Sequence, residues 1–287
     1  PSFLKKNISA ALSSVEVRED VADNVASGLL WTSLRGIDSH GIRLLPHYIS
    51  SVSKGVINPN PKVKFSQLSS SLGYLDADHT FGHHAGVLAM EHCVEMARES
   101  GVAIVSVGNS THCGAMSFFG YESSKEGIAT LSMTHATPRI LSPNTKTAFL
   151  GNNPICFIAP VKDNPPFCFD SATTTTTFNA IKLKGLIGGT LSPGEAADSN
   201  GCETLNPLLA EFLLPIGGYK GYGLSMVVDI LCGALSGMNM GDKVSKMYGD
   251  DAPKRRMLGQ FYLAIDIDKV FSSDKFGADM ERFVGNI

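Results

Sequence analysis

The sequence of 287 residues lacks the short motifs by which nucleotide, metal and hydrolase sites are usually recognised. It contains no GxGxxG and no GxxxxGK followed by Ser or Thr, which argues against a standard Rossmann domain and against a P-loop. It contains no HExxH, no cysteine and histidine pattern with zinc spacing, and no GxSxG. His79, His83 and His84 are close in sequence, but adjacent side chains on a helix point about 100° apart, so we expect no metal site.

Charge and long apolar runs are also scarce. Charged residues make up 18% of the chain and the net charge is −3, so we expect no basic surface and no nucleic-acid partner. No apolar run approaches the roughly 18–20 residues that cross a bilayer, and the start has no signal-peptide core. Six cysteines occur without a CxxC pair, a usage typical of reduced thiols inside the cell. Together these features predict a soluble, cytoplasmic protein without a membrane partner.

Hydrophobic periodicity predicts an α/β fold. Helices are expected over residues 13–34, 43–53, about 87–101, 118–125, a stretch ending near 182, and 224–235. Strands are expected over residues 63–65, 72–76, 102–107, 128–133, a stretch ending at 160, and 260–267. Ser13 and Glu16 fit a capping box for the first helix. The helix over 224–235 is apolar almost all round, which predicts that it is buried.

The stretch over residues 34–41 (LRGIDSHG) gathers polar chemistry directly after the first expected helix. Its glycines allow close approach of a ligand, while Ser39 and His40 offer a hydroxyl and a group that titrates near neutral pH. The alternative is a simple turn in which Asp38 or Ser39 caps the backbone. A triad of Ser39, a histidine and Asp38 or Asp170 is conceivable, but no nucleophile elbow supports it.

Two further positions could belong to a site. His112 follows the expected strand over 102–107 and has small neighbours, which is where α/β sheets place functional groups. Lys220 lies among glycines just before an expected helix, an arrangement that suits a phosphate. The alternatives are a surface histidine and a solvated lysine in a flexible loop.

Six segments, read together, resemble one family. LRGIDSHG, GHHAG, VGNSTHCGA, GNNPICFIAP, FDSAT and YKGYGL occur in the order seen in the type 2 malate/L-lactate dehydrogenases, and the resemblance covers about residues 10–265. It implies a non-Rossmann fold that binds NAD or NADP, with a second domain built from both chain ends, and a homodimer. On this basis we expect residues 1–65 to form the helical part of a substrate and dimer domain, 66–225 the cofactor domain, and 226–287 the return to the first domain, which the family continues by about fifty more residues.

The resemblance also implies roles for individual residues. His112 matches the catalytic acid/base, and an imidazole suits proton transfer to a 2-oxo acid. Ser39 and His40 match residues that line the substrate and nicotinamide pocket, so both are expected to take part in catalysis and substrate binding. Arg43 is a candidate clamp for the substrate carboxylate, although many members place this arginine one residue later, where the chain has Leu44. The cofactor positions are matched by His40, Ala136, Asp170, Ser171, Ala172 and Lys220.

The sequence therefore predicts an NAD- or NADP-dependent oxidoreductase that acts on a small 2-hydroxy or 2-oxo acid of the malate or lactate type. One alternative is a reductase of cyclic imines such as Δ1-piperideine-2-carboxylate, or a ureidoglycolate-type dehydrogenase, from the same family. The other alternative is an inactive nucleotide-binding scaffold. Asp170 could also orient a catalytic histidine or an amide.

Overall fold

The computed structural model describes residues 1–247 and 255–287. Its helices are α1 (Ser2–Ser13), α2 (Glu19–Ser33), α3 (Leu45–Ser53), α4 (Gly82–Ser100), α5 (Ser117–Ser124), α6 (Phe178–Leu186), α7 (Tyr219–Asp229), α8 (Ile267–Val270) and α9 (Ser273–Gly285). Short 3₁₀ turns cover η1 (Asp38–His40), η2 (Ile42–Leu44) and η4 (Gly241–Lys243), and a π-helical turn, η3 (Ile230–Ala234), continues α7. None of these described helices has the length and apolar character of a membrane span.

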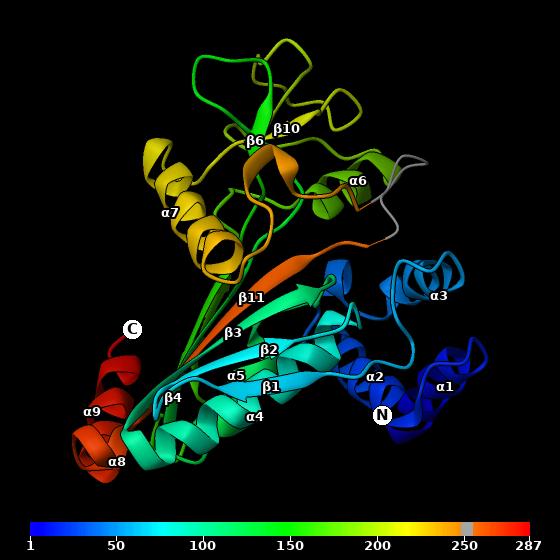
Figure 1. Cartoon of the computed structure of the whole chain (residues 1–287). Coiled ribbons are helices and arrows are strands. Elements are labelled where there is room, and N and C mark those ends of the chain that lie inside the picture. The colour runs from blue at the N-terminus through cyan, green and yellow to red at the C-terminus, as the bar shows by residue number, and fades with distance from the viewer. Residues whose placement is uncertain (248–254) are drawn as a thin grey trace.

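Two sheets organise the chain (Figure 1). The large one has the order β1-β2-β3-β11-β4-β7-β8, and the small one has the order β6-β5-β10-β9. The strands of the large sheet are β1 (Lys64–Gln67), β2 (Leu72–Asp76), β3 (Val102–Ser110), β11 (Leu258–Asp266), β4 (Ile128–Thr134), β7 (Ile155–Ala159) and β8 (Phe167–Ser171). Those of the small sheet are β6 (Ala148–Leu150), β5 (Ile140–Leu141), β10 (Phe212–Leu213) and β9 (Ala196–Ala197).

The last long strand of the chain lies in the middle of the large sheet. β11 pairs antiparallel with β3 on one side and with β4 on the other. Leu258, its first residue, lies opposite Ser110, the last residue of β3, and Gln260 lies opposite Thr134, the last residue of β4. The segments that leave β3 and β4 and the segment that enters β11 therefore meet at one edge of the sheet.

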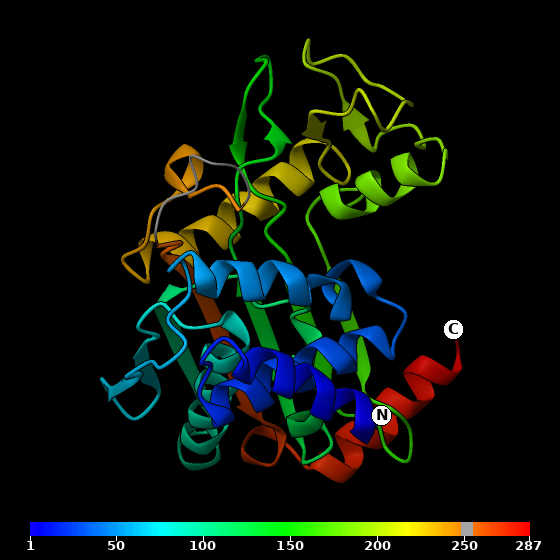
Figure 2. The ribbon, with the colours of Figure 1, turned by 90° about the vertical axis from the view of Figure 1, so that its right-hand side faces the viewer.

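Helices cover both faces of the large sheet. On one face, α4 and α5 bury a core with β3 and β11 that contains Met90, Val105 and Tyr262. On the other, α7 and η3 pack Val228 and Cys232 against the sheet. The N-terminal helices α1, α2 and α3 form a separate apolar cluster that reaches α4, and Figure 2 shows them as a layer beside the sheet, with the small sheet and α6 beyond one end.

The α/β prediction is confirmed, and most of the expected helices and strands are present with shifted ends. The first expected helix is wrong at its start: α1 ends at Ser13, and α2 begins at Glu19. The capping box is wrong because Glu16 lies in the turn between the two helices with a positive φ of 62°. Glu19 and Asp20 instead place negative charge in the first turn of α2, where the helix dipole favours it.

The helix expected over 224–235 is wrong in its burial and its bounds. α7 begins earlier, at Tyr219, and its regular part ends at Asp229. Leu224, Val227 and Ile230 are 43%, 47% and 49% exposed, so only one side of this apolar helix packs on the sheet. β8 was not expected as a strand at all.

The division of the chain at residues 65 and 225 stays a prediction. The first boundary falls at the start of β1 and the second falls inside α7. The large sheet takes strands from the second predicted stretch and β11 from the third, and part of that third stretch lies outside the described residues.

Candidate active site

A pocket opens where the large sheet, the small sheet and α6 meet. Its cavity volume is about 120 Å³, and it is open to solvent at its mouth. Its lining comes from the ends of β3 and β4, the start of β11, and the first turn of α6. The lining residues are His40, His112, Cys113, Gly114, Thr134, His135, Ala136, Thr137, Arg139, Asn152, Pro154, Thr177, Phe178, Asn179, Leu213, Lys246, Met247, Arg256 and Leu258.

His112 lies in the pocket wall two residues after β3 ends. Its Nδ1 lies 2.7 Å from the hydroxyl of Tyr48, a fully buried side chain of α3. This contact fixes the plane of the imidazole and leaves Nε2 as the nitrogen that can exchange a proton with a ligand. The sequence predicted His112 but not Tyr48, which looked like one more apolar position of its helix.

The surroundings of His112 hold its pKa well below the ordinary value. Burial is the main cause, and the positive charges of His40, His83 and Arg256 act in the same direction. The imidazole is therefore neutral at neutral pH. A neutral imidazole in a pocket is a proton acceptor, and it becomes a donor once protonated.

Ser39 and His40 form a pair beside His112. They lie on η1, and the Ser39 hydroxyl is 2.9 Å from His40 Nδ1. The His40 ring is stacked on that of His112, with 5.6 Å between centroids. Asn179 of α6 donates to the Ser39 carbonyl at 3.3 Å, which ties η1 to the other side of the pocket. The structure thus brings His40 and His112 together, while the Ser39 hydroxyl contacts Nδ1 of His40.

Three cations line the pocket: Arg139, Lys246 and Arg256. Among the lining residues within the described parts of the chain, none carries a carboxylate. Arg256 is 6% exposed, and the Arg139 guanidinium lies 4.3 Å from the centre of the Phe178 ring. The pocket therefore favours an anionic ligand.

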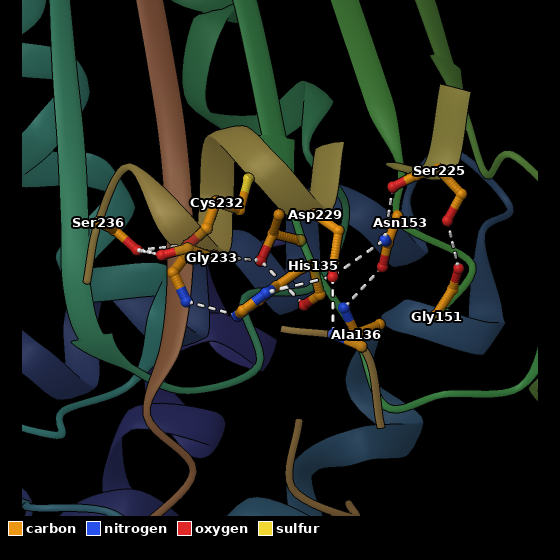
Figure 3. A network of polar contacts seen from close by, with 12 residues as sticks. His135, Ala136, Gly151, Asn153, Ser225, Asp229, Cys232, Gly233 and Ser236 are labelled. Atoms are coloured by element: carbon orange, nitrogen blue, oxygen red, sulfur yellow. Dashed lines mark hydrogen bonds and ion pairs between the residues drawn. The ribbon is translucent and has the colours of Figure 1, made fainter. Parts of the chain in front are cut away.

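A buried polar network supports the floor of the pocket (Figure 3). His135 Nε2 accepts a hydrogen bond from the amide of Gly259 at 2.9 Å, and its Nδ1 faces Asp229 at 3.6 Å. The Asn153 side chain accepts from the amide of Ala136 at 2.9 Å and donates to the Ser225 carbonyl at 3.0 Å. The backbone that follows β4 is thereby fixed to α7.

Several predicted site residues do not line the pocket. Arg43 is exposed on η2, and Lys220 lies in the first turn of α7. Asp170 accepts hydrogen bonds from the amide and hydroxyl of Ser117 at 2.8 and 2.6 Å. Its charge also acts on His40. Ser171 is the last residue of the edge strand β8 and Ala172 follows it, and both lie outside the lining.

Within residues 1–247 and 255–287, no group of three or more His, Cys, Asp or Glu side chains could hold a metal ion. The described lining supplies an imidazole, hydroxyls, amides and cations. These features define a class of protein: a two-sheet α/β protein with a cation-lined pocket beside a buried, neutral histidine.

Comparison with known proteins identifies the family. The family model for malate/L-lactate dehydrogenase matches residues 1–287, and the chain belongs to this family. The chain is 32% identical to the NAD(+)-dependent ureidoglycolate dehydrogenase of Escherichia coli over 273 residues, which is 95% of this chain and 78% of that protein. It is 33% identical to a malate dehydrogenase of Pyrococcus abyssi over 287 residues, covering 96% and 78%.

Solved structures agree with the fold. The malate dehydrogenase of Entamoeba histolytica superposes with a TM-score of 0.91 at 27% identity, covering 98% of this chain and 81% of that one. The Δ1-piperideine-2-carboxylate reductase of Pseudomonas syringae also gives a TM-score of 0.91, at 26% identity, covering 99% and 86%. The expected family and its non-Rossmann fold are thereby confirmed.

Proposed function

We propose that this protein catalyses reversible hydride transfer between NAD and a small 2-hydroxy or 2-oxo acid of the malate or lactate type. The observation that carries the proposal is the position of His112, which Tyr48 orients in a pocket lined by cations. The family and its NAD(+)-dependent relative support the same reaction class.

The protein's own residues account for the proton transfer. In the oxidative direction, neutral His112 accepts the substrate hydroxyl proton at Nε2, while Nδ1 remains hydrogen-bonded to Tyr48. In the reductive direction, the protonated ring returns that proton to the carbonyl oxygen. The nicotinamide, when bound, accepts or supplies the hydride at the same carbon. His40, stacked on His112, restricts where the reacting carbon can lie.

The residues around the pocket fit such a cofactor. Phe178 and Asn179 in the first turn of α6 line the pocket, so a cofactor that enters it would meet the N-terminus of that helix. His40 and Ala136 would contact the part of the cofactor inside the pocket. Lys220 follows Gly217 and Gly218, whose positive φ values of 58° and 65° leave the start of α7 open enough for a phosphate.

The segment Asp170, Ser171 and Ala172 completes the proposed cofactor set. Asp170 fixes the N-terminus of α5 through Ser117, so it would act by shaping the backbone rather than by direct contact. NADP remains an alternative to NAD, and both belong in the first assay.

The direct test is oxidation of NADH and NADPH by the purified chain, followed by loss of nicotinamide absorbance. Oxaloacetate, pyruvate, sulfopyruvate and a cyclic imine are offered in parallel. Turnover with a 2-oxo acid is expected, with NADH preferred. Turnover with the cyclic imine alone would assign the protein to the reductases, as the likeness to the piperideine-carboxylate reductase favours. Cofactor binding without any turnover would favour the inactive scaffold.

We also propose that the protein works as a homodimer. Support comes from the exposed apolar side of α7, formed by Leu224, Val227 and Ile230, because a contiguous apolar face of this kind marks an interaction surface. Val227→Glu is expected to convert dimer to monomer in analytical ultracentrifugation, whereas Lys243→Glu on exposed η4 leaves the mass unchanged. A wild-type protein that sediments as a monomer would contradict the proposal.

The cysteines support a cytoplasmic location. All six are free thiols, four of them buried. Unpaired cysteines are typical of reducing compartments, so we propose that the protein resides in the cytoplasm.

A further inference from the structure

We propose that Arg256 is the residue that grips the substrate carboxylate, in place of the arginine expected near Ser39. This inference rests on the proposed function. The chain has Leu44 where the family commonly has that arginine, and Leu44 is buried in the apolar cluster of the N-terminal helices. The neighbouring Arg43 is exposed and does not line the pocket. A 2-hydroxy acid still carries a carboxylate that requires a partner.

The strand register brings Arg256 to the reacting end of the pocket. Leu258 of β11 lies opposite Ser110 of β3, and the two strands are antiparallel. Arg256 precedes Leu258 by two residues and His112 follows Ser110 by two residues, so both lie just beyond the same end of this strand pair. Both line the pocket. In a 2-hydroxy acid the carboxylate is bonded to the carbon that bears the hydroxyl, so its clamp must lie beside the proton acceptor.

The Arg256 side chain is held in place from two directions. Its Nε donates to the Ser245 hydroxyl at 2.9 Å, and its Nη2 donates to the Thr137 hydroxyl at 3.2 Å. The Ser245 hydroxyl in turn donates to the Arg256 carbonyl at 2.9 Å. The next residue, Met257, adopts a φ of 48°, a conformation that costs energy in a non-glycine residue and accompanies the turn into β11. A fixed guanidinium loses little freedom when it binds a carboxylate.

The other cations that line the pocket fit this role less well. Arg139 lies over the Phe178 ring, and Lys246 is exposed. Of the three, Arg256 is the one whose charge acts on His112. The geometry thus separates Arg256 from the rest: it is buried, hydrogen-bonded to hydroxyls, and adjacent to the imidazole.

The test compares Arg256→Gln and Arg256→Lys with Arg255→Gln, a neighbouring exposed arginine outside the lining. Loss of a charged hydrogen-bonding partner should raise KM for the 2-oxo acid by about 10- to 100-fold in Arg256→Gln. Arg256→Lys should recover part of that loss, and the dissociation constant of NADH should not change. Arg255→Gln should behave as wild type.

The pH profile supplies a readout that a merely structural role would not move. Among residues 1–247 and 255–287, the charged and titratable groups around His112 include His40, His47, Tyr48, His83 and Arg256. Removing the Arg256 charge lessens the repulsion of the imidazolium, so the acid limb of kcat/KM for hydroxy-acid oxidation should move to higher pH. Arg255→Gln should leave that limb unchanged.

The affinity for oxalate, an unreactive dicarboxylate, is measured by calorimetry and distinguishes the Arg256 clamp from the dehydrogenase function. If the wild-type protein turns over 2-oxo acids while Arg256→Gln keeps the wild-type KM and pH profile, the clamp is wrong and the dehydrogenase proposal stands. If no acid is turned over but oxalate binds wild type and not Arg256→Gln, the clamp stands and the dehydrogenase proposal fails. Should Arg256→Gln not fold, Arg256→Lys decides: a raised KM together with a weaker oxalate affinity supports the clamp, and wild-type values of both overturn it.

Discussion

The hydrogen bond between Tyr48 and His112 links the N-terminal helices to the chemistry of the pocket. Tyr48 is fully buried, and its ring also packs edge-on against His83 at 5.6 Å between centroids. The contact selects which nitrogen of His112 faces the ligand. A side chain that belongs to the packing of α3 would therefore also select the ring nitrogen used in the proposed proton transfer.

Tyr48→Phe removes only the hydroxyl from this arrangement. We expect kcat to fall by about 10-fold or more, because the imidazole loses the partner that orients it and general acid–base catalysis depends on that orientation. The dissociation constant of NADH, measured by fluorescence, should remain the same. His112→Ala should fall further, by about 100-fold or more. Equal kcat values in Tyr48→Phe and wild type would show that the hydroxyl does not orient the histidine.

Among the structural elements, β11 and η3 make the closest backbone approach near the site. A Cβ at Gly259 would collide with the carbonyl oxygen of Cys232, and the Gly259 amide donates to His135. The Ser236 hydroxyl also bonds to the Cys232 carbonyl. The π-helical turn therefore lies directly on the strand, which leaves no room for a side chain at this glycine.

Gly259→Ala is expected to destabilise the protein by about 2 kcal/mol or more, because a backbone atom cannot move aside as a side chain can. Thermal unfolding and the urea midpoint would both report it. Gly223→Ala is the matched control, since a Cβ there meets nothing within 4 Å and alanine favours the helix α7. A wild-type melting temperature for Gly259→Ala would show that η3 can shift away from β11.

The elements that the sequence predicted well are those with a strong local pattern. The run over residues 102–107 specified β3, and Gly101, with a φ of 87°, ends α4 as expected. Burial of α7 could not be predicted, because an apolar helix face looks the same whether it packs on this chain or is exposed. The strand β8 lacks regular alternation and depends on its pairing with β7.

The same distinction holds for the site. His112 and His40 occur in short motifs that a resemblance can match position by position. Tyr48 precedes His112 by 64 residues and reaches its ring through the docking of α3. Arg256 follows His112 by 144 residues and reaches the pocket through the strand register. No local pattern carries that information.

For the molecule as a whole, buried histidines govern stability toward acid. Packing lowers the pKa of His83 to about 3, and burial also lowers the pKa of His40, His47, His84 and His112. In the unfolded chain these groups take up protons near pH 6.5, whereas in the folded protein they do not. The unfolded state therefore binds more protons in that range, so stability is fully present above about pH 6.5 and is lost as the pH falls toward 3.

His83→Leu tests this at the most buried of these side chains. Both ring nitrogens of His83 lack a hydrogen-bond partner among the described residues, so the change removes a titrating group without breaking a bond found there. The fall in unfolding free energy between pH 6.5 and 4.5 should become shallower, by up to about 1 kcal/mol per pH unit. Met90→Leu, a buried change on the same helix α4 that removes no titrating group, is the control and should retain the wild-type slope. An unchanged slope in His83→Leu would contradict the assignment.

The central place of β11 bears on how the protein is made. A ribosome releases the chain from its N-terminus, so β3 and β4 emerge more than a hundred residues before the strand that must lie between them. Until residue 266 has left the exit tunnel, β3 and β4 lack the strand that pairs with both of them, and their unpaired edges are exposed to other chains. Completion of the sheet, and of a pocket that takes Arg256 from the same segment, therefore waits until synthesis has passed residue 266.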